Sequence, residues 1–115
     1  MIISLSPAGG TPSEQVYDQL RGLISTGRLA AEERLPSVRQ LASDLGVAPG
    51  TVAKAYKQLE EDGLVVSRTG AGTRVSRSAT PVSRAVAEAA RALAAAARRD
   101  GLTTEDAERI LRAMW

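Results

Sequence analysis

Two short amphipathic segments lie so close together in the chain that they must pack directly on one another. Only Gly46, Val47 and Ala48 separate them, and Gly46 suits the turn because a positive φ is cheap only for glycine. Both have apolar residues at i, i+3, i+4 and i+7, the spacing of a helix with one buried face: Val38, Leu41, Ala42 and Leu45 in 37–45, and Val52, Ala55, Tyr56 and Leu59 in 49–62. This spacing predicts a helix-turn-helix.

A further helix is expected before this pair. Thr11, Pro12 and Glu14 form a capping-box start, and apolar residues recur at Val16, Leu20, Leu23 and Ile24 until Gly27. Ser37 and Gln40 repeat the capping-box pattern at the second helix. Gly22 costs about 1 kcal/mol relative to Ala inside a helix, and close packing against a neighbour would explain it.

Strand-like segments follow the helix-turn-helix. Residues 64–67 and 73–75 predict an antiparallel hairpin, or wing, with its tip at 68–72. At the other end of the chain, residues 1–5 are short and apolar enough to form a strand or a tucked arm. Residues 76–81 contain Ser, Thr and Pro and are expected to be a linker.

The remaining residues predict two helices. The first, 82–100, is rich in alanine and carries a narrow apolar seam of the coiled-coil type: Val82, Val86, Ala89, Leu93 and Ala96. Arg84 and Glu88 lie outside this seam at i, i+4. Thr103 or Thr104 caps the last helix, whose apolar residues are Ala107, Ile110, Leu111, Met114 and Trp115. The fold class is therefore mainly α with a small β-hairpin: a winged helix-turn-helix over 1–78 and a two-helix tail over 79–115.

Composition excludes most catalytic functions. The 115 residues include no His and no Cys, so the chain lacks the commonest acid/base group, thiolate metal ligands and disulfides. No residues are predicted to be catalytic or to bind a metal, and no cofactor is expected. The segment GAGTRV lacks the Gly-Lys-Ser/Thr ending of a phosphate-binding loop. No secretory signal or membrane-spanning segment is visible, so we expect a cytoplasmic protein that is not an enzyme.

The groups outside the core suggest a polyanionic partner. The net charge is only +2, but within 37–79 the acids gather mainly at 60–62 and leave the basic residues elsewhere. A helix start fits the major groove and offers N–H groups to phosphate. The candidate DNA-binding residues are Arg39 on the second helix; Ala48, Pro49, Gly50, Thr51, Lys54 and Lys57 on the third; and Arg68, Thr69 and Arg74 on the wing.

Less specific interpretations stay open for several of these residues. Lys57 and Arg77 could be ordinary solvated charges, and Thr51 could only satisfy backbone groups near a helix start. Gly70 and Gly72 could simply form a tight hairpin. Helix-turn-helix spacing also occurs in proteins that bind no DNA, so a winged-helix protein-interaction module is the alternative function.

The order of motifs resembles the winged helix-turn-helix of GntR-family bacterial transcription regulators. The resemblance rests on VYDQLRGLISTGRLAAEERLPS, LPSVRQLA, LGVAPGTVAKAYKQLEEDGL and SRTGAGTRV, and covers about residues 13–75. It implies that the second helix crosses the DNA backbone, the third enters the major groove and the wing lies at the minor groove. By position it implicates Ser37, Arg39, Ala48, Pro49, Gly50, Thr51, Lys54, Thr69, Gly70 and Gly72.

The chain departs from the family pattern at three positions. The family often has Ser or Thr at the position of Ala48, and Arg at the positions of Pro49 and Ala53. The missing hydroxyl at Ala48 removes a helix cap worth about 1 kcal/mol, partly offset by Pro49. Base recognition must then depend on Arg39, Thr51, Lys54 and backbone contacts.

The tail resembles that of the short YtrA-like subfamily, in which it serves dimerisation. Only 34 residues follow Pro81, too few for the large effector or aminotransferase-like domains of other members. The resemblance implies a homodimer, a repressor, and a palindromic operator in double-stranded DNA, with an unknown small-molecule effector possible. The dimerisation candidates are Val82, Val86, Ala89, Leu93, Ala96, Ile110, Met114 and Trp115. The alternative is that both helices pack on their own winged helix.

Overall fold

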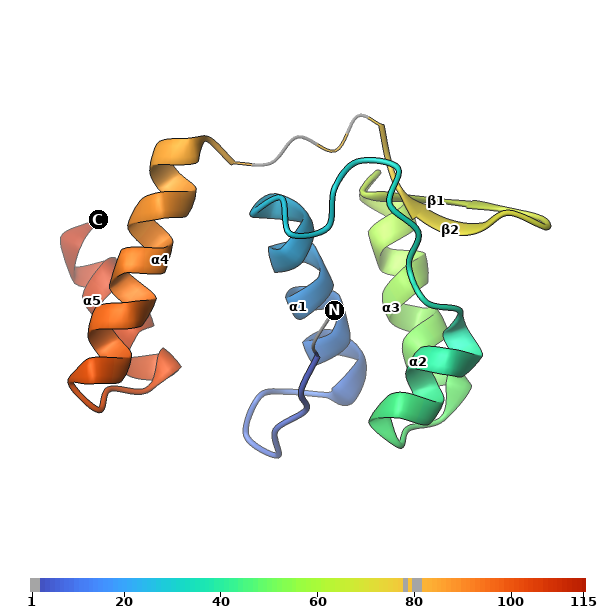
Figure 1. Cartoon of the computed structure of the whole chain (residues 1–115). Coiled ribbons are helices and arrows are strands. Elements are labelled where there is room, and N and C mark those ends of the chain that lie inside the picture. The colour runs from blue at the N-terminus through green and yellow to red at the C-terminus, as the bar shows by residue number, and fades with distance from the viewer. Residues whose placement is uncertain (1–2, 78, 80–81) are drawn as a thin grey trace. The chain divides into compact units, whose positions relative to one another are not determined.

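The computed structural model describes residues 3–77, 79 and 82–115. They fall into two compact units, Met1–Pro81 and Val82–Trp115 (Figure 1). The expected boundary between residues 78 and 79 lies at Ser78, which is outside the described residues. Ser76, expected in the linker, is instead buried, and its N–H donates to the carbonyl of Leu64. The first unit therefore continues past the hairpin.

Three helices form the body of the first unit: α1 (Pro12–Ser25), α2 (Val38–Leu45) and α3 (Pro49–Glu61). α3 packs against both α1 and α2 (Figure 1). The predicted stripe residues Leu20, Leu41, Val52 and Leu59 are all buried in one core, to which both strands of the hairpin contribute a valine. The helix-turn-helix prediction is confirmed.

The turn between α2 and α3 depends on one residue. Gly46 ends α2 in the left-handed region, with φ 68°, and its N–H bonds back to the carbonyls of Ala42 and Ser43. The next N–H, from Val47, also returns to Ala42. A side chain at position 46 would meet nothing, so the constraint is the backbone conformation and not space.

The helix caps are simpler than expected. Thr11 and Ser37 accept the predicted hydrogen bonds from the N–H groups of Glu14 and Gln40. The reciprocal half of each predicted capping box is absent, because the Gln40 amide donates to Asp44 instead and Glu14 makes no return bond among the described residues. Both boxes were therefore wrong as reciprocal motifs, although both N-caps are right.

The wing is a hairpin of β1 (Val65–Arg68) and β2 (Gly72–Val75), paired antiparallel with Val66 opposite Arg74 and Arg68 opposite Gly72. Residues 32–35 run along the free edge of β2, where Arg34 forms a bridge with Arg74. Backbone hydrogen bonds continue on both sides of that bridge, from Glu32 to Val75 and from Leu35 to Thr73. The wing thus has a third extended row that the hairpin signal did not reveal.

The N-terminal segment is a tucked arm. Residues 3–6 are not a strand; Met1 and Ile2 lie outside the described residues. Two glutamines of α1 hold the arm: Gln19 bonds the N–H and carbonyl of Ser4, and Gln15 bonds those of Ser6. Gln15 is buried, and its amide also reaches the carbonyl of Gly10.

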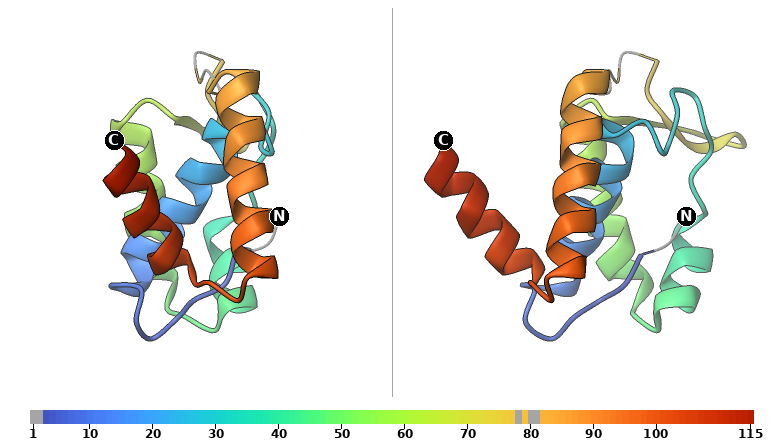
Figure 2. Two further views of the ribbon diagram at one scale, coloured as in Figure 1. Left: turned by 90° about the vertical axis from the view of Figure 1, so that its left-hand side faces the viewer. Right: turned by 60° about the vertical axis from the view of Figure 1, so that its left-hand side comes forward.

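The second unit consists of α4 (Arg84–Arg99) and α5 (Thr104–Met114). α4 begins two residues later than predicted, because the Ser83 hydroxyl caps it by accepting from the N–H of Val86. Val82 therefore lies outside the helix. The predicted Arg84–Glu88 pair is present at 2.9 Å. Figure 2 shows α5 diverging from α4 beyond the connecting turn, and no residue of α5 is buried.

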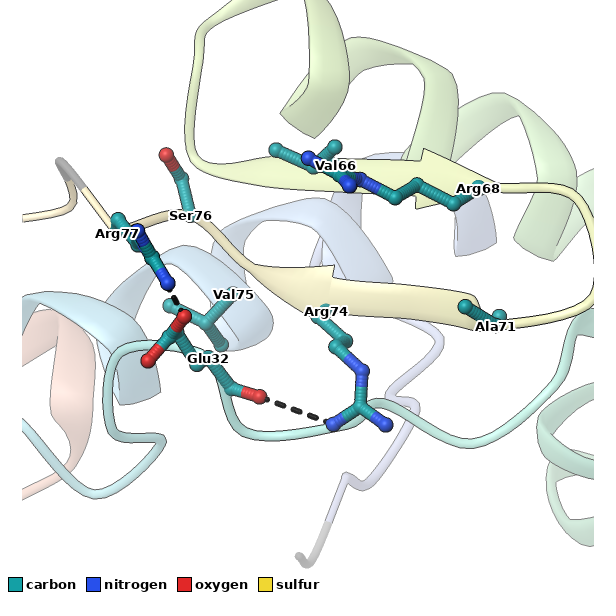
Figure 3. Close-up of a pocket in the computed structure, with 9 residues that line it drawn as sticks. Glu32, Val66, Arg68, Ala71, Arg74, Val75, Ser76 and Arg77 are labelled. Atoms are coloured by element: carbon teal, nitrogen blue, oxygen red, sulfur yellow. Dashed lines mark hydrogen bonds and ion pairs between the residues drawn. The ribbon is translucent and has the colours of Figure 1, made fainter.

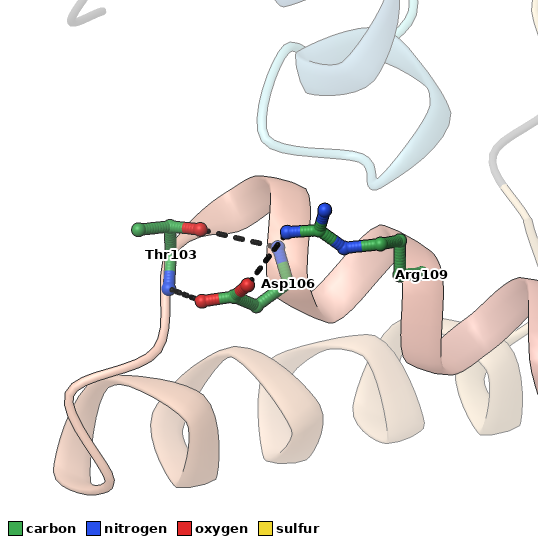
Figure 4. Close-up of polar contacts among 3 residues, drawn as sticks. All are labelled: Thr103, Asp106 and Arg109. Carbon is green, nitrogen blue, oxygen red and sulfur yellow. Dashed lines mark hydrogen bonds and ion pairs between the residues drawn. The ribbon is translucent and has the colours of Figure 1, made fainter.

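α5 begins with a reciprocal capping box. Thr103 is its N-cap: its hydroxyl accepts from the N–H of Asp106, and the Asp106 carboxylate accepts from the N–H of Thr103 (Figure 4). Arg109 donates to the same carboxylate at 2.8 Å. The Thr103 backbone hydrogen bond, with Arg109 next in importance, lowers the pKa of Asp106.

Among the described residues, no helix is long and apolar enough to cross a membrane.

Candidate nucleic-acid interface

The start of α3 is open to solvent. Ala48, Pro49 and Gly50 are exposed, and so are Ala53 and Lys54 one turn later. No side chain caps this helix, because the N-cap is Ala48. The first residues are small, so an external group could approach the backbone closely. Partial positive charge and N–H groups at such a terminus favour an anion.

A buried tyrosine fixes the orientation of α3 relative to the entrance of α2. The Tyr56 hydroxyl donates to the carbonyl of Pro36 at 2.6 Å, immediately before the α2 cap. Burial raises the pKa of Tyr56 to about 12, so the phenol remains a donor at neutral pH. At the C-terminal end of α3, Tyr17 of α1 bonds the Asp62 carboxylate. α3 is therefore anchored near its middle and at its C-terminal end.

Three cations lie on the exposed side of the helix-turn-helix. Arg39, Lys54 and Lys57 are exposed, and within the described part of the chain none makes a side-chain hydrogen bond or ion pair. Nearby Ser37 is exposed but serves as the α2 cap. Thr51 is half-buried, and its hydroxyl satisfies no backbone group among the residues described. These groups are available to a partner.

The acids of α3 lie away from its start. Glu60, Glu61 and Asp62 occupy the last turn, and Asp62 accepts from both Tyr17 and Gln58. Lys54 lines a shallow groove together with two acids of α1, Glu14 and Asp18. The predicted separation of charge along α3 is thus present, with Lys54 at its border.

The predicted DNA-binding residues of the wing differ from one another in exposure and in hydrogen bonding. Thr69 and Gly70 form the exposed tip, and the side chain of Arg68 is exposed and makes no hydrogen bond or ion pair with the described residues. Gly72 is half-buried because the Arg34 guanidinium lies over it; a Cβ there would come within 3.0 Å of Nε. Arg74 is exposed and donates to the carbonyl of Glu32 at 3.2 Å.

Two residues near the wing escaped the sequence analysis. Arg34 and Glu32 come from the segment between α1 and α2, yet they lie against β2. Glu32 also forms an ion pair with Arg77, for which an ordinary solvated charge was one of the open interpretations. No periodicity marks this segment, so only the pairing of distant chain segments could have revealed them.

The dimerisation candidates are apolar groups without a complete core. Two of them are half-buried, Leu93 and Ala96. The other six are exposed: Val82, Val86, Ala89, Ile110, Met114 and Trp115. Trp115 is 99% exposed and Met114 80%. The two buried residues of α4 are Ala87 and Ala97, which lie off the predicted seam. Within one chain, the seam is therefore not a packed surface.

No group of His, Cys, Asp and Glu suited to a metal ion occurs among the described residues. What remains is three helices, an exposed helix start with free cations, and a basic wing. This architecture is that of a winged helix-turn-helix protein.

The comparison with protein families gives the class a name. The family "Bacterial regulatory proteins, gntR family" matches residues 12–75, and the chain belongs to this GntR family. Over 79 residues it is 39% identical to the HTH-type transcriptional repressor YtrA of Bacillus subtilis (strain 168). The matched segment covers 68% of this chain and 61% of that relative. The chain thus spans less than two thirds of that relative's length.

Solved structures show the same relationship. YtrA from Sulfolobus acidocaldarius, a GntR-family transcription factor, is 37% identical with a TM-score of 0.61, covering 82% of this chain and 99% of that one. AraR(DBD) in complex with operator ORX1 is 28% identical with a TM-score of 0.57, covering 66% of this chain and 92% of that one. The first unit therefore has the fold of domains that have been seen on operator DNA.

Proposed function

We propose that this protein is a sequence-specific DNA-binding transcription regulator. The observation that carries the proposal is the open start of α3, where small residues leave the backbone accessible and Lys54 and Lys57 have no partner within the described chain. Such a helix start enters the major groove, while the cations bind phosphates. The operator complexes of AraR support this assignment by similarity.

Different residues then have different tasks at the DNA. Arg39, with its free guanidinium on α2, is assigned to guanine or to a phosphate clamp, and Thr51 to a base edge or phosphate. Ala48, Pro49 and Gly50 allow close approach, and Ser37 positions α2. Thr69, Gly70 and Gly72 shape the wing, and Arg68 and Arg74 supply its charge. Affinity should come mainly from phosphates and should fall with salt.

The second unit is proposed to join two copies. Its apolar side chains Val86, Ile110, Leu111, Met114 and Trp115 are exposed in a single chain, and a second copy would cover them. A two-fold dimer would present two α3 helices to a palindromic operator. The exposed apolar side chains support our assignment of residues 79–115 to dimerisation, and we infer repression by similarity to the Bacillus subtilis repressor.

The test begins with selection of duplexes from a random library by the full-length protein, followed by binding titrations. Arg39→Ala should weaken the selected duplex by about tenfold or more and reduce discrimination, because a base contact is lost. Lys54→Ala should weaken selected and unrelated duplexes alike and reduce the salt slope of the dimer by about 1.8, or about 0.9 for each of its two Lys54 side chains. Arg28, an exposed arginine just after α1 and outside both the helix-turn-helix and the wing, provides the matched control Arg28→Ala.

Three results would contradict the proposal. A selection that yields no preferred duplex would indicate a fold that serves only protein interaction. Arg39→Ala and Arg28→Ala would behave alike if the α2–α3 surface were not the binding face. Binding insensitive to salt would exclude a phosphate-dominated interface.

A further inference from the structure

Four arginines from distant parts of the first unit gather on one side of the wing. Arg34, Arg74 and Val66 are directly opposite one another across the three extended rows, so their side chains share a face. Arg68 is two residues from Val66 and therefore lies on the same face. Arg77 follows β2 and reaches the same region. We call these residues, Arg34, Arg68, Arg74 and Arg77, the arginine face.

A hollow of about 590 Å³ opens on the arginine face. Arg68, Arg74 and Arg77 line it together with a single carboxylate, Glu32 (Figure 3). Four guanidinium groups and one carboxylate leave this face strongly positive. Arg34 and Arg68 make no hydrogen bond or ion pair with other described side chains. The hollow is thus a basic surface with one internal acid.

Glu32 contacts two of these arginines. Its Oε1 accepts from Arg77 Nε at 2.6 Å, and its carbonyl accepts from Arg74 at 3.2 Å; Figure 3 shows both contacts. Its N–H donates to the carbonyl of Val75. The Arg77 guanidinium lowers the pKa of Glu32, which therefore stays charged at neutral pH.

The backbone of Glu32 is unusual. Its φ is 67°, and it is the one non-glycine with positive φ among the described residues. Glutamate adopts this conformation at a cost, and such positions are enriched where a side chain has a role. The Arg77–Glu32 pair is nevertheless open to water, with side chains 86% and 59% exposed. An exposed pair is weak enough to be exchanged for another anion.

We propose that Glu32 is an intramolecular counter-ion of the arginine face, and that a DNA backbone phosphate replaces its carboxylate at Arg77 when the protein binds. The inference rests on the proposed DNA-binding function. A phosphate offers Arg77 the same oxygen geometry as a carboxylate. Glu32 therefore lowers affinity for any duplex, without reading its sequence, because phosphate contacts carry no sequence information.

The test measures the affinity of the full-length protein for its selected duplex and for an unrelated duplex of equal length, at about 0.15 M salt, where distant surface charges are screened. Glu32→Gln should bind both duplexes about two- to fivefold more tightly, because a weak exposed ion pair no longer competes. Glu33→Gln is the matched control: it removes the neighbouring exposed carboxylate, which contacts the N–H of Ala30 and no arginine.

A second comparison shows whether Glu32 acts through Arg77. In an Arg77→Gln background, Glu32→Gln should no longer improve binding. Glu32→Gly removes the same carboxylate while suiting the positive φ, so it should bind DNA as Glu32→Gln does and should unfold no more easily than the wild type. This variant separates charge from folding.

Each alternative outcome is distinct. Equal effects of Glu32→Gln and Glu33→Gln, a gain that persists without Arg77, or a gain confined to the selected duplex would each overturn the inference while leaving the proposed function intact. A wild-type protein that binds no duplex would overturn the proposed function itself. Titration with inorganic phosphate completes the set: tighter phosphate binding by Glu32→Gln with unchanged DNA affinity would assign the hollow to a free anion and contradict the exchange.

Discussion

Gly22 and Gly46 both have empty space where a side chain would be, yet their backbones differ. Gly22 is an exposed residue in the last turn of α1 and lacks a positive φ, whereas Gly46 ends α2 with φ 68°. Close packing, which the sequence analysis offered to explain Gly22, does not occur among the described residues. Only Gly46 has a conformational reason to be glycine.

Substitution by alanine should therefore have opposite effects at these two positions. Gly22→Ala should raise the free energy of unfolding by about 0.5–1 kcal/mol, because alanine favours the helix. Gly46→Ala should lower it by about 1 kcal/mol, because alanine must adopt the left-handed conformation. Urea denaturation measures both. Destabilisation by Gly22→Ala would show that this face of α1 is covered in the assembled protein.

At the scale of elements, apolar periodicity and local caps were enough to predict most of the fold. The α2 and α3 stripes and the Gly46 turn needed only neighbouring residues, and they were right. The predicted start of α4 was wrong by two residues, because the Ser83 hydroxyl caps the helix and leaves the apolar Val82 outside it. Glu32 and Arg34 could not be predicted, because their place at the wing depends on pairing between segments about forty residues apart.

The contact between α3 and the entrance of α2 should make stability depend on alkaline pH. The folded pKa of Tyr56 is about 12, above the ordinary value of 10, so the neutral phenol stabilises the fold fully below pH 10. Stability should then fall as pH rises from 10 towards 12, by at most about 1.4 kcal/mol per pH unit for one group.

Chemical denaturation between pH 8 and 12 measures this dependence. Tyr56→Phe should remove the part of the pH dependence that comes from Tyr56. It should also lower the free energy of unfolding at neutral pH by about 1 kcal/mol, because the hydrogen bond to Pro36 is lost. Tyr17→Phe is the comparison, because the pKa of Tyr17 is also raised, mainly by its hydrogen bond to Asp62. This variant should lose the contribution of Tyr17 and keep that of Tyr56. An unchanged pH profile in Tyr56→Phe would contradict the assigned cause.

At the scale of the whole molecule, the second unit lacks an interior for its apolar groups. The candidate site on the first unit could be predicted from exposed residues of known chemistry, but the dimer contacts could not, because a seam says nothing about its partner. Leu111, half exposed on α5, provides a sharp test. Leu111→Ser should raise the dimer dissociation constant at least about tenfold, because burying a leucine contributes about 1.5–3 kcal/mol.

Sedimentation velocity over a dilution series measures this constant. Glu108→Ser, an exposed polar position on the same helix, is the matched control and should leave association nearly unchanged. A wild-type protein that remains a monomer at all concentrations would contradict the dimer. So would a Leu111→Ser variant that associates as tightly as the wild type.

We propose that two copies of α3 read duplex DNA from the open helix start that follows Gly46. Hydroxyl-radical footprinting of the selected duplex checks this arrangement. We expect two protected half-sites related by two-fold symmetry and centred about one helical turn, or about 10 base pairs, apart. A single protected patch, or protection that persists when Arg39 and Lys54 are both replaced by alanine, would contradict it.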